Sequence, residues 1–235
     1  MTMARFFSPA QFNPLDINPL RDLLTEQIDF ERLRRASSIK LFVAATQVST
    51  GMLKLFRNRQ LSVDVLLASA CLPSLHHPVE IDGEAYWDGG LTANPPIFPL
   101  IHLCSARDVM VVLLHPCRRP ETPATIEQIA HRLGEISFNS AFFTELGGLA
   151  LAKRAAEQAS WCSNGLERRL KRLNMHVVEA HELMSQLDAI SKLNTDAAFI
   201  YGMRDQGRGR ATLWLEQHYN ALGARSSFNL SPYLQ

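Results

Sequence analysis

The sequence predicts an α/β fold, with a mostly parallel sheet in the first half of the chain and helices in the second half. Residues 39–48 and 108–114 are apolar on both faces, a pattern typical of strands that are covered on both sides of a sheet. The segment between them from Pro95 to Leu103 has the character of a helix that begins at a proline. A buried strand, a helix and a second buried strand indicate a crossover connection, which joins parallel strands.

The other elements are indicated by their ends and their periodicity. Helices are expected at residues 19–28, 29–35 and 63–71, which begin at or just after Pro19, Asp29 and Ser62. Residues 52–56 alternate as a more exposed strand does. Asp82-Gly83 separates two short β-like runs, so it predicts a two-residue hairpin turn. From Thr125 onward, apolar residues recur at spacings of three to four, which predicts amphipathic helices.

A second Asp-Gly pair, in Asp88-Gly89-Gly90, predicts a different structure. It cannot be another hairpin turn, because prolines follow at 95 and 96 and proline cannot donate to a returning strand. A short strand is therefore expected to end at Asp88. The two residues after it have no Cβ, which lets another group approach the backbone closely.

The surroundings of Asp88 suggest a chemical role. Apolar neighbours at Tyr86, Trp87 and Leu91 would leave the carboxylate poorly solvated and raise its pKa. A carboxylate of that kind suits a general base for a serine nucleophile. A crevice shared with the strand end at 115–117 is also expected. The alternative is a solvated aspartate that caps the helix after Gly90.

Four motifs around Asp88 keep a fixed order and spacing. They are Ala68-Ser69-Ala70-Cys71-Leu72-Pro73, Glu80-Ile81-Asp82-Gly83, Tyr86-Trp87-Asp88-Gly89-Gly90 and Asn94-Pro95. Together they resemble the second half of the patatin-like phospholipase domain. In that family a D-G-G or D-G-A aspartate pairs directly with the serine of a G-x-S-x-G motif, without a catalytic histidine. The resemblance implies that Asp88 is the catalytic aspartate and that Gly89 and Gly90 shape its turn.

Further along the chain, Glu135 to Ser140 resembles a helical extension found in a bacterial subgroup of the same family. We therefore expect part of a three-layer α/β/α patatin-like domain in residues 1–120 and a mainly helical extension in residues 121–235. The family's glycine-rich oxyanion loop and its G-x-S-x-G motif do not occur in the sequence. The expected protein is thus the portion of the domain that carries Asp88 but no nucleophile.

The resemblance implies a serine–aspartate hydrolase that cleaves lipid acyl esters without a cofactor. Because the nucleophile is missing, this chain alone is expected to be inactive. The alternative is a non-catalytic remnant that binds lipid or a partner protein. In either case the open side of the sheet would favour self-association.

Other candidate sites have less support. Ser69 lacks the glycine neighbours of a strained nucleophile elbow. His76 and His77 have no cysteine or carboxylate nearby to complete a metal site, and the four cysteines form no C-x-x-C pair. Gly207 to Arg210 is too short and too solitary for a phosphate loop or a nucleic-acid patch, and a final helix is expected from about Arg210 to Gly223.

Net charge and hydropathy limit the kinds of partner and the cellular compartment that we expect. The net charge of +1 gives no global attraction to nucleic acid. The sequence shows no signal peptide and no apolar run near the roughly 20 residues of a spanning helix. We therefore expect a cytoplasmic protein, with a peripheral position at the membrane as the alternative. The basic segment 166–173 is interpreted as a surface helix, and membrane contact is its alternative.

Overall fold

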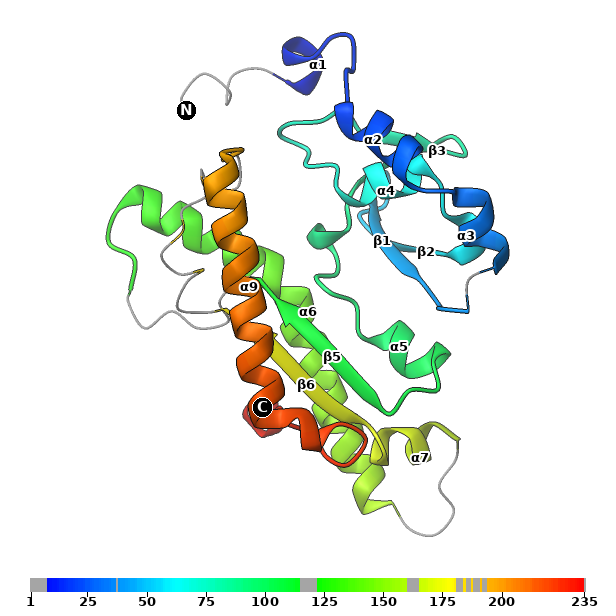
Figure 1. Cartoon of the computed structure of the whole chain (residues 1–235), viewed down its shortest axis with the longest axis vertical. Helices are drawn as coiled ribbons and strands as arrows, with labels where there is room; N and C mark the ends of the chain where they lie inside the picture. The colour runs from blue at the N-terminus through cyan, green and yellow to red at the C-terminus, as the bar shows by residue number, and fades with distance from the viewer. Residues whose placement is uncertain are drawn as a thin grey trace. The chain divides into compact units, whose positions relative to one another are not determined.

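The computed structural model describes residues 8–36, 38–114, 122–159, 165–180, 184, 187, 191 and 194–234. The chain divides into two compact units, Met1–Pro96 and Ile97–Gln235 (Figure 1). The sequence predicted a domain boundary near residue 120. The division into compact units falls between Pro96 and Ile97, and strand β5 (Asp108–Leu113) packs within the second unit.

The first unit contains short helices and a small sheet. Its elements are α1 (Pro9–Phe12), α2 (Pro19–Gln27), α3 (Phe30–Ala36), β1 (Phe42–Gln47), β2 (Leu53–Arg57), α4 (Val63–Ser69), β3 (Val79–Ile81) and β4 (Glu84–Asp88). The predicted helix starts are confirmed by their caps. Asp29 Oδ1 accepts the N–H of Arg32 at 2.9 Å, and Ser62 Oγ accepts the N–H of Val65 at 3.3 Å.

The sheet of the first unit differs from the expected one. Its strands run in the order β2-β1-β4-β3, and every neighbouring pair is antiparallel. The mostly parallel sheet was therefore a wrong prediction for this unit. Short turns join β1 to β2 and β3 to β4, and a connection that short can only join antiparallel strands. The turn between β3 and β4 is the predicted hairpin, with positive φ at both Asp82 (53°) and Gly83 (81°).

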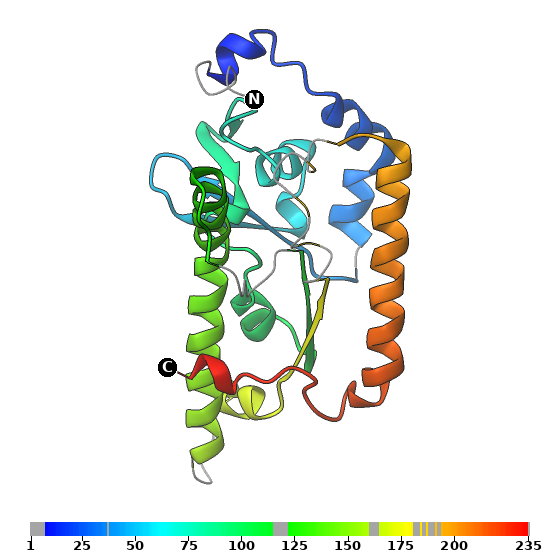
Figure 2. The same ribbon diagram turned by 90° about the vertical axis from the view of Figure 1, so that its left-hand side faces the viewer.

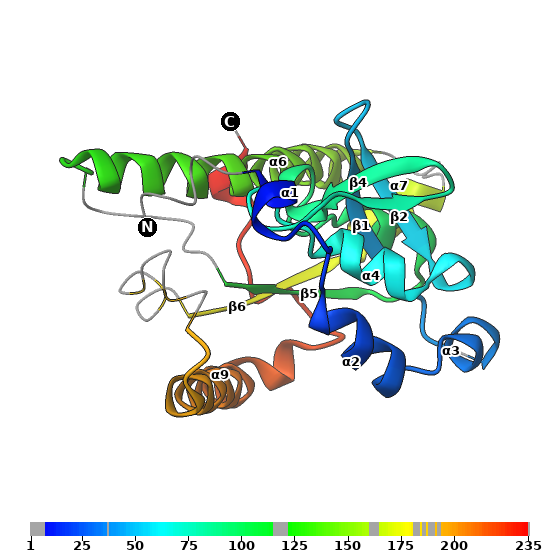
Figure 3. The ribbon, with the colours of Figure 1, turned by 90° about the horizontal axis from the view of Figure 1, so that it is seen from above.

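A small core holds these elements together. Helix α4 contacts β1, β3 and β4 and lies against one face of the sheet (Figure 3). The buried residues are Ala45, Phe56, Leu61, Val65, Ala68 and Tyr86. The apolar run of β1 is thus explained by its central place in the sheet, between β2 and β4.

The second unit is built around a parallel pair of strands. Its elements are α5 (Phe98–Leu103), β5, α6 (Ile126–Gln158), α7 (Gly165–Lys171), β6 (Asn174–Glu179) and α9 (Ala197–His218). The crossover predicted between residues 39–48 and 108–114 is wrong, because β1 and β5 lie in different sheets. Strands β5 and β6 pair in parallel. Helix α6 lies on one face of this pair and α9 on the other (Figures 2 and 3). The α/β class is thereby confirmed, and this unit has the three-layer α/β/α arrangement.

The helices of the second unit are longer than the sequence suggested. Helix α9 is continuous from Ala197 to His218, so the helix start predicted at about Arg210 is wrong. Glycine in a helix interior costs about 1 kcal/mol relative to alanine, which a long helix with a capped start tolerates. Asp196 Oδ2 provides that cap by accepting the N–H of Phe199 at 2.9 Å. Among the helices that the structure describes, none is both long and apolar enough to cross a bilayer.

Two lysines join α6 and α7 end to end. Lys153 Nζ on α6 donates to the carbonyl of Leu170, in the last turn of α7, at 3.1 Å and to that of Leu173, just after α7, at 2.9 Å. In return, Lys171 Nζ donates to the carbonyl of Ala159 at the end of α6, at 3.0 Å. Each ammonium therefore satisfies carbonyls that a helix end leaves without partners.

Glu145 of α6 caps the start of α5. Its Oε1 accepts the N–H of Ile97 at 2.9 Å and also the N–H of Phe98. Partial burial raises the pKa of the Glu145 carboxyl, although these two hydrogen bonds act in the opposite direction. The folded state holds the proton of this carboxyl group more tightly than the unfolded chain does. The fold therefore loses stability as the group ionises.

This shift predicts a pH-dependent effect of Glu145→Gln. The contribution of Glu145 is fully present below the unfolded pKa and is lost as the pH rises through the raised folded pKa. Glutamine keeps an accepting oxygen and does not ionise. The free energy of unfolding of the variant, relative to that of the wild type, should therefore rise between pH 4 and pH 7, as measured by urea denaturation. A difference that is constant or reversed over that range would contradict the assignment.

Candidate functional site

Asp88 is the last residue of β4 and is held by the backbone on two sides. It is paired with Ala45 of the central strand β1. Its N–H donates to the carbonyl of Cys71, just after α4, at 2.8 Å. The end of α4 therefore lies against the strand that carries Asp88.

The turn after Asp88 orients its carboxylate. Gly89–Leu91 forms a single 3₁₀ turn, and Asp88 Oδ1 accepts the N–H of Gly90 at 2.7 Å. This is the capping contact expected if Asp88 serves only to end the strand. It also fixes the direction of the carboxylate, which is a requirement for a general base.

Gly89 is in closer contact with β1 than any other residue type would allow. A Cβ built on Gly89 would lie 2.2 Å from the carbonyl oxygen of Ala44 and 2.5 Å from its carbonyl carbon. Both atoms belong to the backbone of the central strand, so they cannot move aside as a side chain can. The predicted close approach at the D-G-G turn is thereby confirmed.

A pair of threonines supports the same turn from β1. The hydroxyl of Thr46 is buried, donates to the carbonyl of Asp88 at 2.8 Å and lies 2.9 Å from the hydroxyl of Thr92. Thr92 Oγ1 in turn lies 3.4 Å from the carbonyl oxygen of Gly89. Both ends of the turn are therefore connected to one buried hydroxyl on the central strand.

Cys71 lies beside Asp88 but is not a candidate nucleophile. Its side chain is 1 % exposed, and Sγ donates to the carbonyl of His77 at 3.0 Å. Burial raises the pKa of this thiol to about 11, and the nearby charges of Asp88 and Asp16 act in the same direction. The thiolate, which is the reactive form, is therefore scarce near neutral pH.

The apolar neighbours of Asp88 enclose it only in part. Tyr86 is buried and packs edge-on against Phe56, with ring centroids 5.5 Å apart. Leu91, by contrast, is 39 % exposed. Asp88 itself is half-buried. The strand end at 115–117, expected to form a crevice with Asp88, lies outside the described residues.

The first unit also has a cavity of about 460 Å³ that does not include Asp88. It is lined by Asp16, Asn18, Leu20, Arg21, Asp64, Leu67, Ala70, Cys71, His76, His77, Pro78, Val79 and Glu80. His77 Nε2 is engaged with the carbonyl of Asn13 at 2.9 Å. Within the part of the chain that the structure describes, no group of three or more His, Cys, Asp or Glu residues could hold a metal ion.

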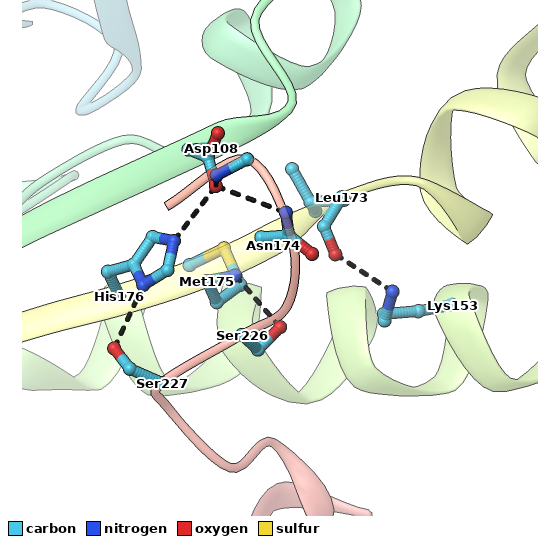
Figure 4. A network of polar contacts seen from close by, with 9 residues as sticks. Asp108, Lys153, Leu173, Asn174, Met175, His176, Ser226 and Ser227 are labelled. Carbon is cyan, nitrogen blue, oxygen red and sulfur yellow. Dashed lines mark hydrogen bonds and ion pairs between the residues drawn. The ribbon is translucent and has the colours of Figure 1, made fainter. Parts of the chain in front are cut away.

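The second unit brings together a serine, a histidine and an aspartate that the sequence analysis missed (Figure 4). His176 is fully buried on β6, and its Nδ1 lies 2.8 Å from Ser227 Oγ. Its Nε2 lies 3.0 Å from Asp108 Oδ1. The partners are 51 and 68 residues away along the chain, so no local motif indicates this array.

The surrounding contacts show that this array anchors the C-terminal segment. The N–H groups of Ser227 and Phe228 both donate to the carbonyl of Met175, so neither is available as an oxyanion donor. Ser226 Oγ accepts the N–H of Met175 at 3.1 Å (Figure 4). Asp108 Oδ1 also accepts the N–H of Gly223 at 2.9 Å.

Comparison with known proteins gives one result for the first unit. Residues 5–101 match the family model described as Patatin-like phospholipase. The match includes the β3–β4 hairpin, the D-G-G turn and most of α5, while residues 5–7 lie outside the described part of the chain. No curated protein gives a significant match to the chain. The resemblance inferred from the motifs around Asp88 is thereby confirmed for this segment.

The contact at Gly89 predicts that alanine is not tolerated there. Gly89→Ala would force a methyl group into the Ala44 carbonyl and should lower the free energy of unfolding by about 3 kcal/mol or more. Gly134→Ala, at an exposed helical position with nothing within 4 Å, is the matched control and should stabilise by about 0.5–1 kcal/mol. Chemical denaturation of both variants measures the difference, and equal stabilities would contradict the packing.

The threonine contacts predict a specific cost for removing one hydroxyl. Thr46→Val keeps the shape but removes the donor to the Asp88 carbonyl, so it should destabilise by about 1–3 kcal/mol. Thr46→Ser keeps the hydroxyl, so the Gly90 N–H should stay protected from hydrogen exchange. Hydrogen exchange at that amide, measured alongside the denaturation midpoint, separates the two variants. A valine variant as protected as the serine variant would show that the hydroxyl does not hold the turn.

Proposed function

We propose that the first unit provides the aspartate half of a serine–aspartate lipid acyl hydrolase, with Asp88 as the general base. The observation that carries the proposal is the D-G-G turn. Asp88 stands at a strand end with its carboxylate oriented by the Gly90 N–H, and its position is fixed by the contact of Gly89 with β1. The family match over residues 5–101 supports the same role.

In this proposal the chemistry is acyl transfer. The serine hydroxyl gives its proton to Asp88 as its oxygen attacks the acyl carbonyl, and the departing alcohol then takes that proton. Water, deprotonated by Asp88 in the same way, releases the acyl group as a free acid. Gly89 and Gly90 allow the close turn that presents the carboxylate. No cofactor takes part in either step.

The nucleophile of this proposed reaction comes from outside the 235 residues, since the sequence contains no G-x-S-x-G motif. On its own the chain is therefore expected to be inactive toward acyl esters. The proposed substrates are lipid acyl esters at a membrane or lipid surface. If no serine segment ever joins it, the first unit is instead a binding module for lipid or for a partner.

Self-association is a further part of the proposal. Among the described residues, β5 pairs only with β6, so its other edge has no strand beside it. Met110 and Val112 of β5 are exposed by 42 % and 65 %, and Leu114 just after the strand is exposed by 65 %. An open strand edge with apolar neighbours favours pairing with another chain.

The role of Asp88 is tested by restoring the serine. The chain is expressed with a segment that carries the oxyanion loop and G-x-S-x-G of a patatin-like hydrolase, and ester hydrolysis is measured with p-nitrophenyl butyrate. Asp88→Asn keeps the shape but removes the base, so kcat should fall by at least about a hundredfold.

Asp82→Asn is the matched control, because it makes the same change at the exposed hairpin turn. It should leave the turnover rate unchanged. A serine-directed phosphonate should label the added serine in the Asp82 variant and not in the Asp88 variant. Full activity of Asp88→Asn would leave Asp88 as a structural cap only.

A further inference from the structure

Exposed arginines from three parts of the chain gather at one end of the second unit. Arg107 directly precedes β5 and Arg172 precedes β6, and the N–H of Asn174 donates to the carbonyl of Arg107 at 2.8 Å. Arg225 is next to Ser226, which bonds the start of β6. Figure 1 shows the starts of both strands beside α7 and the loop that follows α9.

Helix α7 adds a fourth cation to the same end. Arg168 lies on α7, and Arg172 is the first residue after the helix. Both are exposed, and the side chain of Leu166 at the start of α7 is 41 % exposed. We call Arg107, Arg168, Arg172 and Arg225 the arginine edge.

The described residues provide no counter-ion for the arginine edge. In the part that the structure describes, none of the four side chains has an ion pair or a hydrogen bond. The nearest strand carboxylate, Asp108, is already bound to His176, Asn174 and the N–H of Gly223. Segments 104–108, 165–175 and 222–228 hold six Lys and Arg against two Asp and Glu, although the whole chain has a net charge of only +1.

We propose that the arginine edge docks the protein on an anionic lipid surface. Exposed arginines close to anionic headgroups attract them, and each contributes about a fivefold gain in affinity. Two exposed leucines in the same segments, Leu166 and Leu222, supply apolar groups that can enter the headgroup region. The side chain of Leu222 is 38 % exposed. This inference does not depend on Asp88 or on hydrolysis.

The surface fits lipid better than nucleic acid. Proteins that bind single strands combine a basic groove with aromatic side chains on which bases stack. The only aromatic residue in the three segments is Phe228, which packs against the core of the unit. The arginine edge therefore offers charge and aliphatic groups without a stacking surface.

Vesicle binding by the full chain tests the proposal. Wild-type protein is sedimented with vesicles of phosphatidylcholine containing 30 % phosphatidylserine and with pure phosphatidylcholine vesicles. We expect binding only to the anionic vesicles, and a marked loss between 0.1 M and 0.5 M salt because exposed charges are screened. Replacing Arg107, Arg172 and Arg225 with Glu should weaken binding by more than about a hundredfold, from about fivefold for each arginine removed.

Two further variants keep the test decisive. Replacing exposed Arg57, Arg59 and Arg208 with Glu makes the same charge change elsewhere and should reduce binding far less. Replacing Arg107, Arg172 and Arg225 with Lys keeps the charge and should bind like the wild type, with circular dichroism confirming the fold. Equal losses in both Glu variants, binding to neutral vesicles, or tighter binding to a duplex DNA than to the anionic vesicles would overturn the proposal.

Discussion

The contact between Gly89 and the backbone of Ala44 is the constraint on which the first unit depends. Because no Cβ fits at residue 89, the chain can leave β4 while still pressed against the central strand. That proximity lets the Thr46 hydroxyl reach the carbonyl of Asp88. The position of the Asp88 backbone is therefore set by β1, and the Gly90 N–H then sets the direction of the carboxylate.

Features encoded by a few adjacent residues were predictable from the sequence. The Asp82-Gly83 hairpin, the capped helix starts and the strand that ends at Asp88 each follow from the φ preference or hydrogen-bonding capacity of one or two residues. The D-G-G turn belongs to this group, since two adjacent glycines indicate that another group lies close to the backbone. What they approach, the Ala44 carbonyl, required the fold.

Features that depend on distant pairing were not predictable in the same way. An apolar run such as β1 has the same composition in a parallel and in an antiparallel sheet, and only the short connections decide between them. The array of Asp108, His176 and Ser227 depends on the parallel register of β5 and β6 and on the return of the C-terminal segment. Glycines in α9 misled because helix continuity there is set by a cap and by packing of Trp214.

A comparison of Asp108 with Asp88 shows why residue identity alone does not define an active site. Asp108 has a histidine and a serine in line, yet the amides beside Ser227 are consumed by Met175 and the histidine is sealed from solvent. The polar groups of this array are satisfied within the fold, which stabilises it. For the same reason, the amides beside Ser227 are not free to bind a transition state. Asp88 has no histidine, but it is half-buried at a strand end and is not sealed from solvent as His176 is. The proposed role of Asp88 therefore rests on its partial exposure and not on the number of suitable side chains around it.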